Sequence, residues 1–311
     1  MSYTKKPFTA RSSDGTHTLS GVIYLPGSDA IGYLHVVHGM TEHIERYHRF
    51  MSDAAEAGYI CFGFDNLGHG NTAKNDSELG YIANKDGYKL LAKDVTIFAD
   101  AVKKECGHAL PYYLLGHSMG SFIVRVATVL GLHPDKLIIM GTAGKNPAAG
   151  AGLMLISLIK LFFGDKHFSP LIDKIAFGSY NDRFGGGSID DPKPWLTNDV
   201  EVRKKYYSDK FCSFNFSVSA MGDLIKLIQL SNNASWYKSF PRDVPVLLVS
   251  GKDDPVGNYG KGVCEVNERL KNSGVSSEIV LYPEARHEIL NDFTYDKVKE
   301  DIFAFLDPRK S

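Results

Sequence analysis

Apolar residues occur along this chain in short continuous runs, separated by longer segments in which they recur with helical spacing. The short runs predict buried strands, because a strand covered on both faces carries no polar side. They cover residues 19–25, 33–37, 59–64, 112–117 and 136–140. The helical patterns between them span about residues 46–57, 88–104 and a stretch from 119 onward. Strands alternating with helices in this way predict an α/β fold with a mostly parallel sheet.

The alternation stops after residue 141 and resumes near residue 244. Between these points lie an apolar helical segment, a glycine-rich bend at 184–188 and a proline-rich corner at 190–195, with no clear strand. Strands then follow at 244–250 and 278–282, with helices at about 259–271 and 296–306. Because the sheet pattern continues on both sides, we expect one core domain formed by residues 1–145 and 241–311, with a helical cap inserted at 146–240.

Composition and charge exclude several classes of function. Of the 311 residues, 43% are hydrophobic and 23% charged, and the formal net charge is −1. Without a basic run, nucleic acid is not an expected partner. No apolar stretch is long enough to span a membrane, no apolar segment follows the first lysines as in a secretory signal, and the four cysteines form no CxxC pair. We therefore expect a cytoplasmic protein without a disulfide framework.

One serine stands between two glycines directly after a predicted strand. The segment GHSMG places Ser118 between Gly116 and Gly120. Glycines let a strand and the following helix approach closely around a tight turn, which leaves the serine hydroxyl exposed at its tip. The pattern is short enough to arise by chance, so Ser118 is a candidate nucleophile only if the chain also supplies a base and an acid.

Later strands supply both. Asp253 and Asp254 follow the strand at 244–250, and His287 follows the strand at 278–282. Each has a simpler explanation, since paired acids favour solvated turns and most single loop histidines lie on the surface. The order serine, acid, histidine is nevertheless that of α/β-hydrolases and differs from the orders in chymotrypsin and subtilisin.

An acyl-transfer site also needs backbone N–H donors for the oxyanion. One is expected from Met119, at the start of the helix after Ser118, where the helix dipole also favours an anion. The second is expected from Met40, in the loop after the strand at 33–37, where Gly39 allows the backbone to turn.

Five segments, taken in order, resemble the motifs of the α/β-hydrolase superfamily. They are HGMTEHIERY (38–47), DNLGHG (65–70), GHSMG (116–120), GKDDPVG (251–257) and ARH (285–287). The pattern is similar to the monoacylglycerol lipase and lysophospholipase-like branch, of the serine aminopeptidase S33 type. This resemblance implies the α/β-hydrolase fold, a triad of Ser118, Asp254 and His287, and Asp254 rather than Asp253 as the acid.

The resemblance has departures and open positions. Thr41 stands where the family usually has glycine, and the cap carries no motif that can be matched. Glu42, His43 and Arg46 match a polar loop of the family. They are candidates either for binding the alcohol end of a substrate or for a buried network that braces the loop.

These observations predict a serine hydrolase that cleaves carboxylic esters of medium or long acyl chains, without a cofactor. No catalytic metal is expected, since His287-Glu288 lacks the second histidine of HExxH, and His38 and His43 have no carboxylate or cysteine at a suitable spacing. The apolar helix at 152–164 either packs on the core or forms a transient membrane or micelle contact.

Two other functions remain open. A peptidase of the proline iminopeptidase type would need acidic cap residues for a free ammonium group. The available ones are Asp190, Asp191, Asp199 and Glu201. A non-catalytic ligand-binding protein on a hydrolase scaffold is the other alternative, because fold alone does not fix function. The sequence leaves the oligomeric state open.

Overall fold

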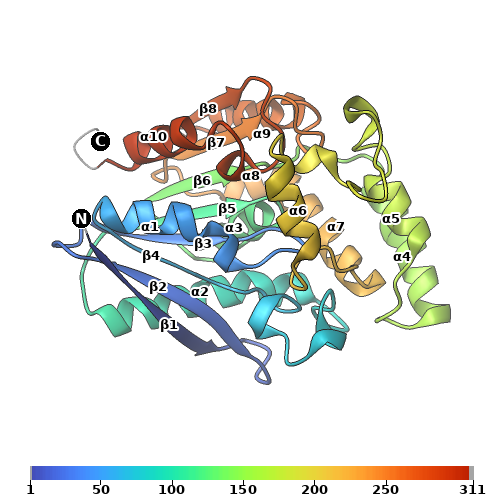
Figure 1. Ribbon diagram of the computed structural model, residues 1–311, viewed down its shortest axis with the longest axis horizontal. Helices are drawn as coiled ribbons and strands as arrows, with labels where there is room; N and C mark the ends of the chain where they lie inside the picture. Colours follow the sequence, from blue (N-terminus) through green and yellow to red (C-terminus); the bar gives the residue numbers. More distant parts are fainter. Residues whose placement is uncertain (1, 308–311) are drawn as a thin grey trace.

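The computed structural model describes residues 2–307 and contains a central sheet with strand order β1-β2-β4-β3-β5-β6-β7-β8 (Figure 1). The strands are β1 (Tyr3–Arg11), β2 (Thr18–Pro26), β3 (Gly32–Val37), β4 (Tyr59–Phe64), β5 (Tyr112–His117), β6 (Lys136–Met140), β7 (Val246–Gly251) and β8 (Ser277–Tyr282). From β4 to β8 all neighbours pair in parallel, whereas β1 and β2 are antiparallel to their neighbours. The predicted α/β fold is confirmed.

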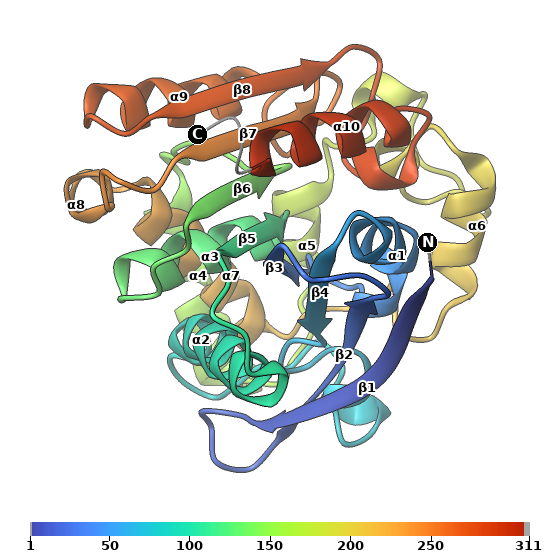
Figure 2. The same cartoon turned by 90° about the vertical axis from the view of Figure 1, so that its left-hand side faces the viewer.

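Helices cover both faces of the sheet, as Figure 2 shows. One face packs against α1 (His48–Glu56) and α10 (Tyr295–Leu306). The other packs against α2 (Gly87–Cys106), α3 (Met119–Val129) and α9 (Lys261–Asn272). The strands β3 to β7 are buried except for the partly buried Lys136 at the start of β6, which explains why their sequences are nearly continuous apolar runs.

The insertion after β6 is helical and contains no strand. Its helices are α4 (Ala149–Phe163), α5 (Pro170–Phe177), α6 (Val200–Ser208), α7 (Val218–Asn232) and α8 (Ala234–Ser239). Short 3-10 turns lie at η4 (Asp182–Phe184) and η5 (Pro194–Leu196). Residues of α7 and α8, such as Leu227 and Trp236, join the same core as α2 and α3. The outer elements, α4 and α5, lie at the edge of the molecule farthest from the N-terminus (Figure 1).

Two local elements differ from those expected. Strand β1 was not predicted, because its sequence YTKKPFTAR is mostly polar and only partly buried at the sheet edge. The helix expected from residue 46 begins as a 3-10 turn, η1 (Ile44–Tyr47), and becomes α-helical only at His48.

The remaining 3-10 turns are η2 (Gly70–Thr72), η3 (Asp76–Glu78) and η6 (Ile289–Asn291). Within residues 2–307, no helix is both long and apolar enough to cross a membrane.

Candidate active site

Ser118 lies at the turn between β5 and α3 in a strained backbone conformation, with φ 53° and ψ −119°. The two glycines around it are required by packing. A Cβ on Gly120 would lie 2.1 Å from the carbonyl oxygen of Val37, and one on Gly116 would lie 2.4 Å from the carbonyl oxygen of Gly120. Non-glycine residues at positive φ cost free energy and concentrate at functional sites. The geometry is therefore that expected of an activated serine at a strand–helix turn.

Asp254 and His287 meet beyond the ends of β7 and β8. His287 Nδ1 lies 2.9 Å from Asp254 Oδ2, and Asp254 is fully buried. Asp254 also accepts hydrogen bonds from the Val256 amide at 2.9 Å and the Ser250 hydroxyl at 3.3 Å. When Nδ1 donates to the carboxylate, Nε2 is left as the acceptor that a general base needs.

The acid next to Asp254 has a different environment. Asp253 is only partly buried, and its backbone amide donates to the carbonyl of Ala285 at 3.0 Å. The structure therefore pairs His287 with Asp254 rather than with Asp253.

His287 is almost completely buried, with 3% of its surface exposed. Burial alone would lower its pKa, but the charge and hydrogen bond of Asp254 raise the pKa above the ordinary value of 6.5. Its ring lies against the rings of His117 and Trp195, with centroid distances of 4.8 and 5.2 Å. These neighbours restrict the orientation of the imidazole.

Ser118 and His287 line the same cavity, which has a volume of about 850 Å³. This lies within the range of roughly 300–1,000 Å³ typical of small-molecule sites. Its lining includes the apolar and aromatic residues Phe122, Phe177, Phe214, Phe216, Leu224 and Ile228. Thr41, Tyr206 and Lys193 also line the cavity and supply polar groups. The cavity therefore offers both apolar surface and a few hydrogen-bonding groups.

The loop after β3 approaches the serine closely. A Cβ on Gly39 would lie 3.0 Å from the Cβ of Ser118, and the Gly39 amide donates to Glu42 Oε1 at 2.5 Å. Met40 and Met119 both line the cavity. Met119 is the first residue of α3, where a backbone N–H has no acceptor within the helix. The roles of these two amides as oxyanion donors stay predictions.

Thr41, where related sequences usually have glycine, has a positive φ of 52°. A β-branched residue rarely adopts this conformation, whereas glycine does so readily. The Thr41 hydroxyl lies 2.7 Å from the hydroxyl of Tyr206 on α6, and both residues line the cavity. The departure from the family pattern therefore places a strained threonine in contact with the cap.

Glu42 and Arg46 belong to a buried polar network behind this loop. Arg46 Nη1 donates to Glu42 Oε2 at 2.9 Å, and the guanidinium binds both carboxylate oxygens of Glu288 at 2.7 Å. Glu42 Oε1 also accepts from Tyr47 at 2.9 Å and lies 3.2 Å from His117 Nδ1. Every side chain of the network is at least mostly buried, so it braces the loop that carries Gly39 and Met40.

The charges of this network stabilise one another. Burial opposes ionisation of Glu42, but the hydrogen bond from His117 and the charge of Arg46 hold its pKa well below the usual value. Burial likewise opposes the charge on Arg46, while Glu288 and Glu42 raise its pKa well above the usual value. The arginine is therefore ionised and bound to two carboxylates.

The structure separates the three polar residues predicted from this loop. Glu42 lines the cavity, whereas Arg46 and His43 are not among the described residues that do so. His43 Nε2 lies 2.9 Å from Asp209 Oδ2, just beyond the end of α6. For Arg46 this geometry fits the bracing role, and for His43 it fits a contact with the cap.

Several residues of the site were not predicted from the sequence. His117 and Glu288 directly neighbour Ser118 and His287 in the sequence, so adjacency to a candidate residue was the available signal. Trp195 and Tyr206 come from the cap, where no pattern marks them. Among the described residues, one group of potential metal ligands, His43, Asp209 and Cys212, lies close together, and none of its members lines the cavity.

The candidate nucleophile lies at the end of β5, its candidate partners lie on the loops beyond β7 and β8, and the fold is that of an α/β-hydrolase. The model of the family described as serine aminopeptidase, S33, matches residues 28–294. The chain belongs to this family.

Known relatives include lipases and esterases. The chain is 28% identical to the monoglyceride lipase of Saccharomyces cerevisiae, over 89% of this chain and 84% of that protein. It is 22% identical to a monoacylglycerol lipase of Mycolicibacterium smegmatis, over 95% of this chain and 98% of the relative. Among solved structures, a thermostable carboxyl esterase from Bacillus coagulans in complex with glycerol superposes with a TM-score of 0.90 at 28% identity, covering 99% of this chain and 98% of the other. The chain is thus a distant homologue of lipases and esterases.

Proposed function

We propose that this protein is a serine hydrolase that cleaves carboxylic esters of medium or long acyl chains on a small alcohol, such as a monoacylglycerol. The observation that carries the proposal is the hydrogen bond between Asp254 and His287 at the wall of the cavity that Ser118 also lines. The homology to monoglyceride lipases supports the class of substrate.

In this mechanism Ser118 Oγ attacks the ester carbonyl while His287 Nε2 accepts the hydroxyl proton. The carbonyl oxygen becomes an oxyanion bound by the amides of Met40 and Met119. His287 then donates the proton to the leaving alcohol, and an acyl group remains on Ser118. Water, deprotonated by His287, releases the acid and restores the serine. Asp254 holds the imidazole in its tautomer and stabilises the imidazolium throughout.

The cap supports a lipid-like substrate. Exposed apolar side chains recur at helical spacing on α4, α5 adds two more, and we propose that together they form one apolar face. We call this the cap apolar face. Its members are Met154, Leu158, Leu161, Phe162 and Phe163 of α4, and Leu171 and Ile175 of α5. Exposed apolar patches of this kind mark interaction sites. Since Phe177 at the end of α5 lines the cavity, we propose that the cap apolar face contacts a membrane or micelle during substrate uptake.

The peptidase alternative has less support from the cap. Of the four predicted acids, only Asp190 lines the cavity. Asp191 is bound by Arg203 and Tyr207, Asp199 caps α6, and Glu201 pairs with Lys204. The cavity wall also includes Lys193, which would oppose a substrate ammonium group, and one further cap acid, Asp173, which would favour it.

A fluorophosphonate probe tests the nucleophile. Wild-type protein should be labelled at one serine, and Ser118→Ala should abolish labelling. Ser213→Ala is the matched control, because Ser213 also lines the cavity but has no role in the mechanism. Wild-type labelling of Ser118→Ala would refute the proposed nucleophile, and an unlabelled wild-type protein would favour the non-catalytic ligand-binding alternative.

Substrate class is tested by comparing kcat/KM for p-nitrophenyl esters of increasing chain length, a monoacylglycerol and a proline arylamide. We expect the longer esters and the monoacylglycerol to be cleaved fastest. Arylamide cleavage faster than every ester would instead support the peptidase function.

A further inference from the structure

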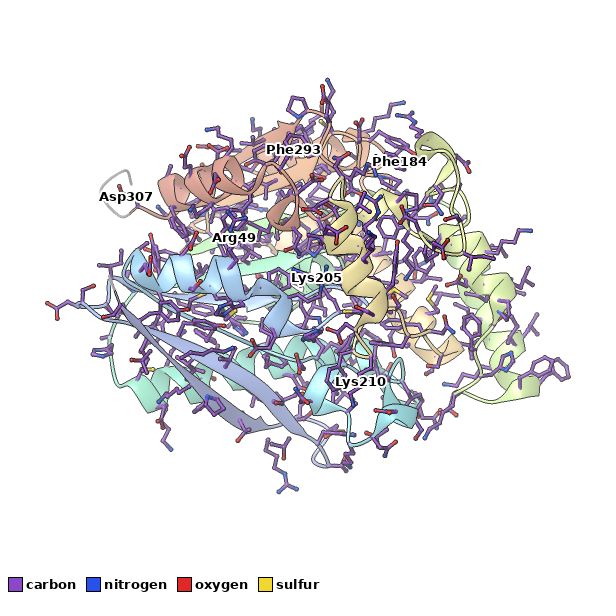
Figure 3. All side chains as sticks on the ribbon, in the orientation of Figure 1. Arg49, Phe184, Lys205, Lys210, Phe293 and Asp307 are labelled. Atoms are coloured by element: carbon purple, nitrogen blue, oxygen red, sulfur yellow. The ribbon has the colours of Figure 1, made fainter. Side chains whose placement is uncertain are left out.

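His43, Asp209 and Cys212 meet where the loop after β3 contacts the end of α6. One potential ligand atom from each residue lies within 4.8 Å of the other two. The chain brings these groups together from positions 166 residues apart, since His43 belongs to the loop that carries Met40, while Asp209 and Cys212 belong to the cap. Figure 3 labels Lys205 on α6 and Lys210, which directly follows Asp209 in the chain.

We propose that His43, Asp209 and Cys212 form a binding site for one zinc ion, separate from the catalytic centre. The ligand atoms would be His43 Nε2, a carboxylate oxygen of Asp209 and Cys212 Sγ, with water as the fourth ligand. This inference does not depend on the proposed esterase function.

The distances are compatible with tetrahedral coordination after small side-chain movements. Zinc binds nitrogen, oxygen and sulfur at about 2.0–2.3 Å, so ligand atoms of a tetrahedral site lie about 3.3–3.6 Å apart. Here His43 Nε2 and Asp209 Oδ2 are 2.9 Å apart, and no pair of ligand atoms exceeds 4.8 Å. Side-chain shifts of about 1 Å would bring the ligand atoms to the separations of a tetrahedral site.

The ligand types favour zinc over other common divalent ions. Imidazole and thiolate together suit a borderline-soft ion, whereas magnesium and calcium prefer oxygen ligands alone. An ionised aspartate and a thiolate would neutralise the charge of Zn²⁺, and the thiol proton would be released to solvent. Arg46 and Lys193 are cations near Cys212, and the charge of Arg46 is balanced by Glu42 and Glu288.

The burial of the three groups suits a site that is held by protein and open to water on one side. Cys212 is buried at 4% exposure, while the side chains of His43 and Asp209 are 12% and 35% exposed. Water can therefore reach the ion beside Asp209. The backbone around Asp209 is fixed, because its Oδ1 accepts the Phe211 amide at 2.8 Å and its carbonyl accepts the Cys212 amide at 3.0 Å.

Bound zinc would link the cap to the loop that carries the proposed oxyanion donor Met40, because its ligands come from both segments. Without the ion, the side chain of His43 contacts this part of the cap through its hydrogen bond to Asp209 and through the ring of Phe211, at a centroid distance of 5.8 Å. Bound zinc would replace the hydrogen bond with one coordinate bond to His43 and two to the cap residues Asp209 and Cys212.

The experiment uses the full chain without an affinity tag, stripped of metal by a chelator. Cobalt(II) is titrated first, because a cysteine ligand produces a thiolate-to-cobalt absorption band in the near ultraviolet. Zinc is then added to displace cobalt and measure zinc affinity. We expect one cobalt per chain with this band, and zinc binding that Cys212→Ser and His43→Ala each weaken by at least about tenfold.

Cys264→Ser is the matched control, since Cys264 is a free cysteine on α9, outside the cluster. It should retain the band and the affinity of the wild type. If Cys212→Ser does not fold, Asp209→Asn serves instead, because the amide oxygen can still accept from His43 but is a poorer ligand. The proposal is overturned if the wild type binds no zinc, or if Cys212→Ser (Asp209→Asn where Cys212→Ser does not fold) binds zinc as tightly as Cys264→Ser.

Discussion

Thr41 shows how a single backbone angle explains a family preference. At a φ of 52° a threonine is strained by about 1–2 kcal/mol, which glycine would avoid. The hydroxyl pair with Tyr206 offsets part of this cost, since a net hydrogen bond contributes about 1 kcal/mol. The backbone strain at Thr41 is therefore partly offset by its side-chain contact with the cap.

This balance predicts the order of stability of two variants. Thr41→Ala keeps the positive φ and loses the hydroxyl, so it should be destabilised by about 1–2 kcal/mol. Thr41→Gly also loses the hydroxyl but relieves the strain, and should be about 1 kcal/mol more stable than Thr41→Ala. Urea denaturation measures both. Lys93, at an exposed position within α2, provides the control: there the alanine variant should be more stable than the glycine variant. If Thr41→Ala were also more stable than Thr41→Gly, the strain argument would be contradicted.

The pKa of His287 predicts the pH dependence of catalysis. His287 must be neutral to accept the serine proton, and Asp254 raises its pKa above 6.5. kcat/KM should therefore fall as pH decreases through a value above 6.5. In Asp254→Asn this limb should move to lower pH, and kcat should fall by a factor on the order of 10⁴. An unchanged pH profile in Asp254→Asn would contradict the pairing.

The raised pKa of His287 also affects folding stability. Its contribution to stability falls as pH rises, whereas kcat/KM falls as pH decreases. Because the pKa of His287 is higher in the folded than in the unfolded state, its contribution to stability is fully present below pH 6.5. It is lost as pH rises through the folded-state value. Asp254→Asn should remove this dependence.

At the level of elements, α4 is the helix whose sequence left two explanations open. The structure buries only Ala149 and Ile156 on it, and exposes Leu161 and Phe162 at 76% each. Packing on the molecule therefore accounts for one side of the helix and leaves the other side apolar and exposed.

Polar substitution on this helix tests the proposed membrane contact. Leu161→Ser combined with Phe162→Ser should weaken binding to phosphatidylcholine vesicles by at least about tenfold, because apolar side chains each contribute about 1.5–3 kcal/mol when fully buried. Cosedimentation measures binding, and hydrolysis of a short water-soluble ester should not change. Leu130→Ser, at an exposed position after α3, is the control. Equal vesicle binding by all three proteins would exclude the contact.

Elements were predictable from sequence where burial determines composition. Strands β3 to β7 are apolar because both faces are covered, so their runs were visible. Strand β1 at the edge is half-exposed and polar, and its pairing with β2 depends on backbone hydrogen bonds that no side-chain pattern records. In the cap, the apolar helix expected at 152–164 corresponds to α4, whereas the bounds of the other helices were not predicted.

At the level of the whole molecule, the network around Arg46 joins the loop after β3 to the loop after β8. Arg46 and Glu288 are 242 positions apart in the chain. Arg46→Met would leave two buried carboxylates without their partner, and should reduce the free energy of unfolding by about 3–5 kcal/mol. Lys204→Met, which breaks the exposed pair with Glu201, should leave the free energy of unfolding almost unchanged. Chemical denaturation compares the two; equal losses would contradict a buried network.

Contacts between distant segments also mark the limit of sequence reasoning about the site. The candidates Ser118 and His287 could be placed because each follows an apolar strand, and strand ends gather at one edge of a parallel sheet. The partners from the cap, Trp195 and Tyr206, could not, because their positions depend on how an irregular segment folds back. For the same reason, the sequence around His43 does not predict that Asp209 and Cys212 lie next to it in the fold.

The cap is also attached to the histidine loop by its backbone. The amide of His287 donates to the carbonyl of Trp195 at 3.4 Å, and that of Glu288 to the carbonyl of Leu196 at 2.7 Å. An engineer who exchanged the whole insertion for that of a relative, in order to change substrate preference, would thereby remove the acceptors that position the imidazole. A productive chimera should keep residues 194–197 from this chain and join the foreign segments on either side of them.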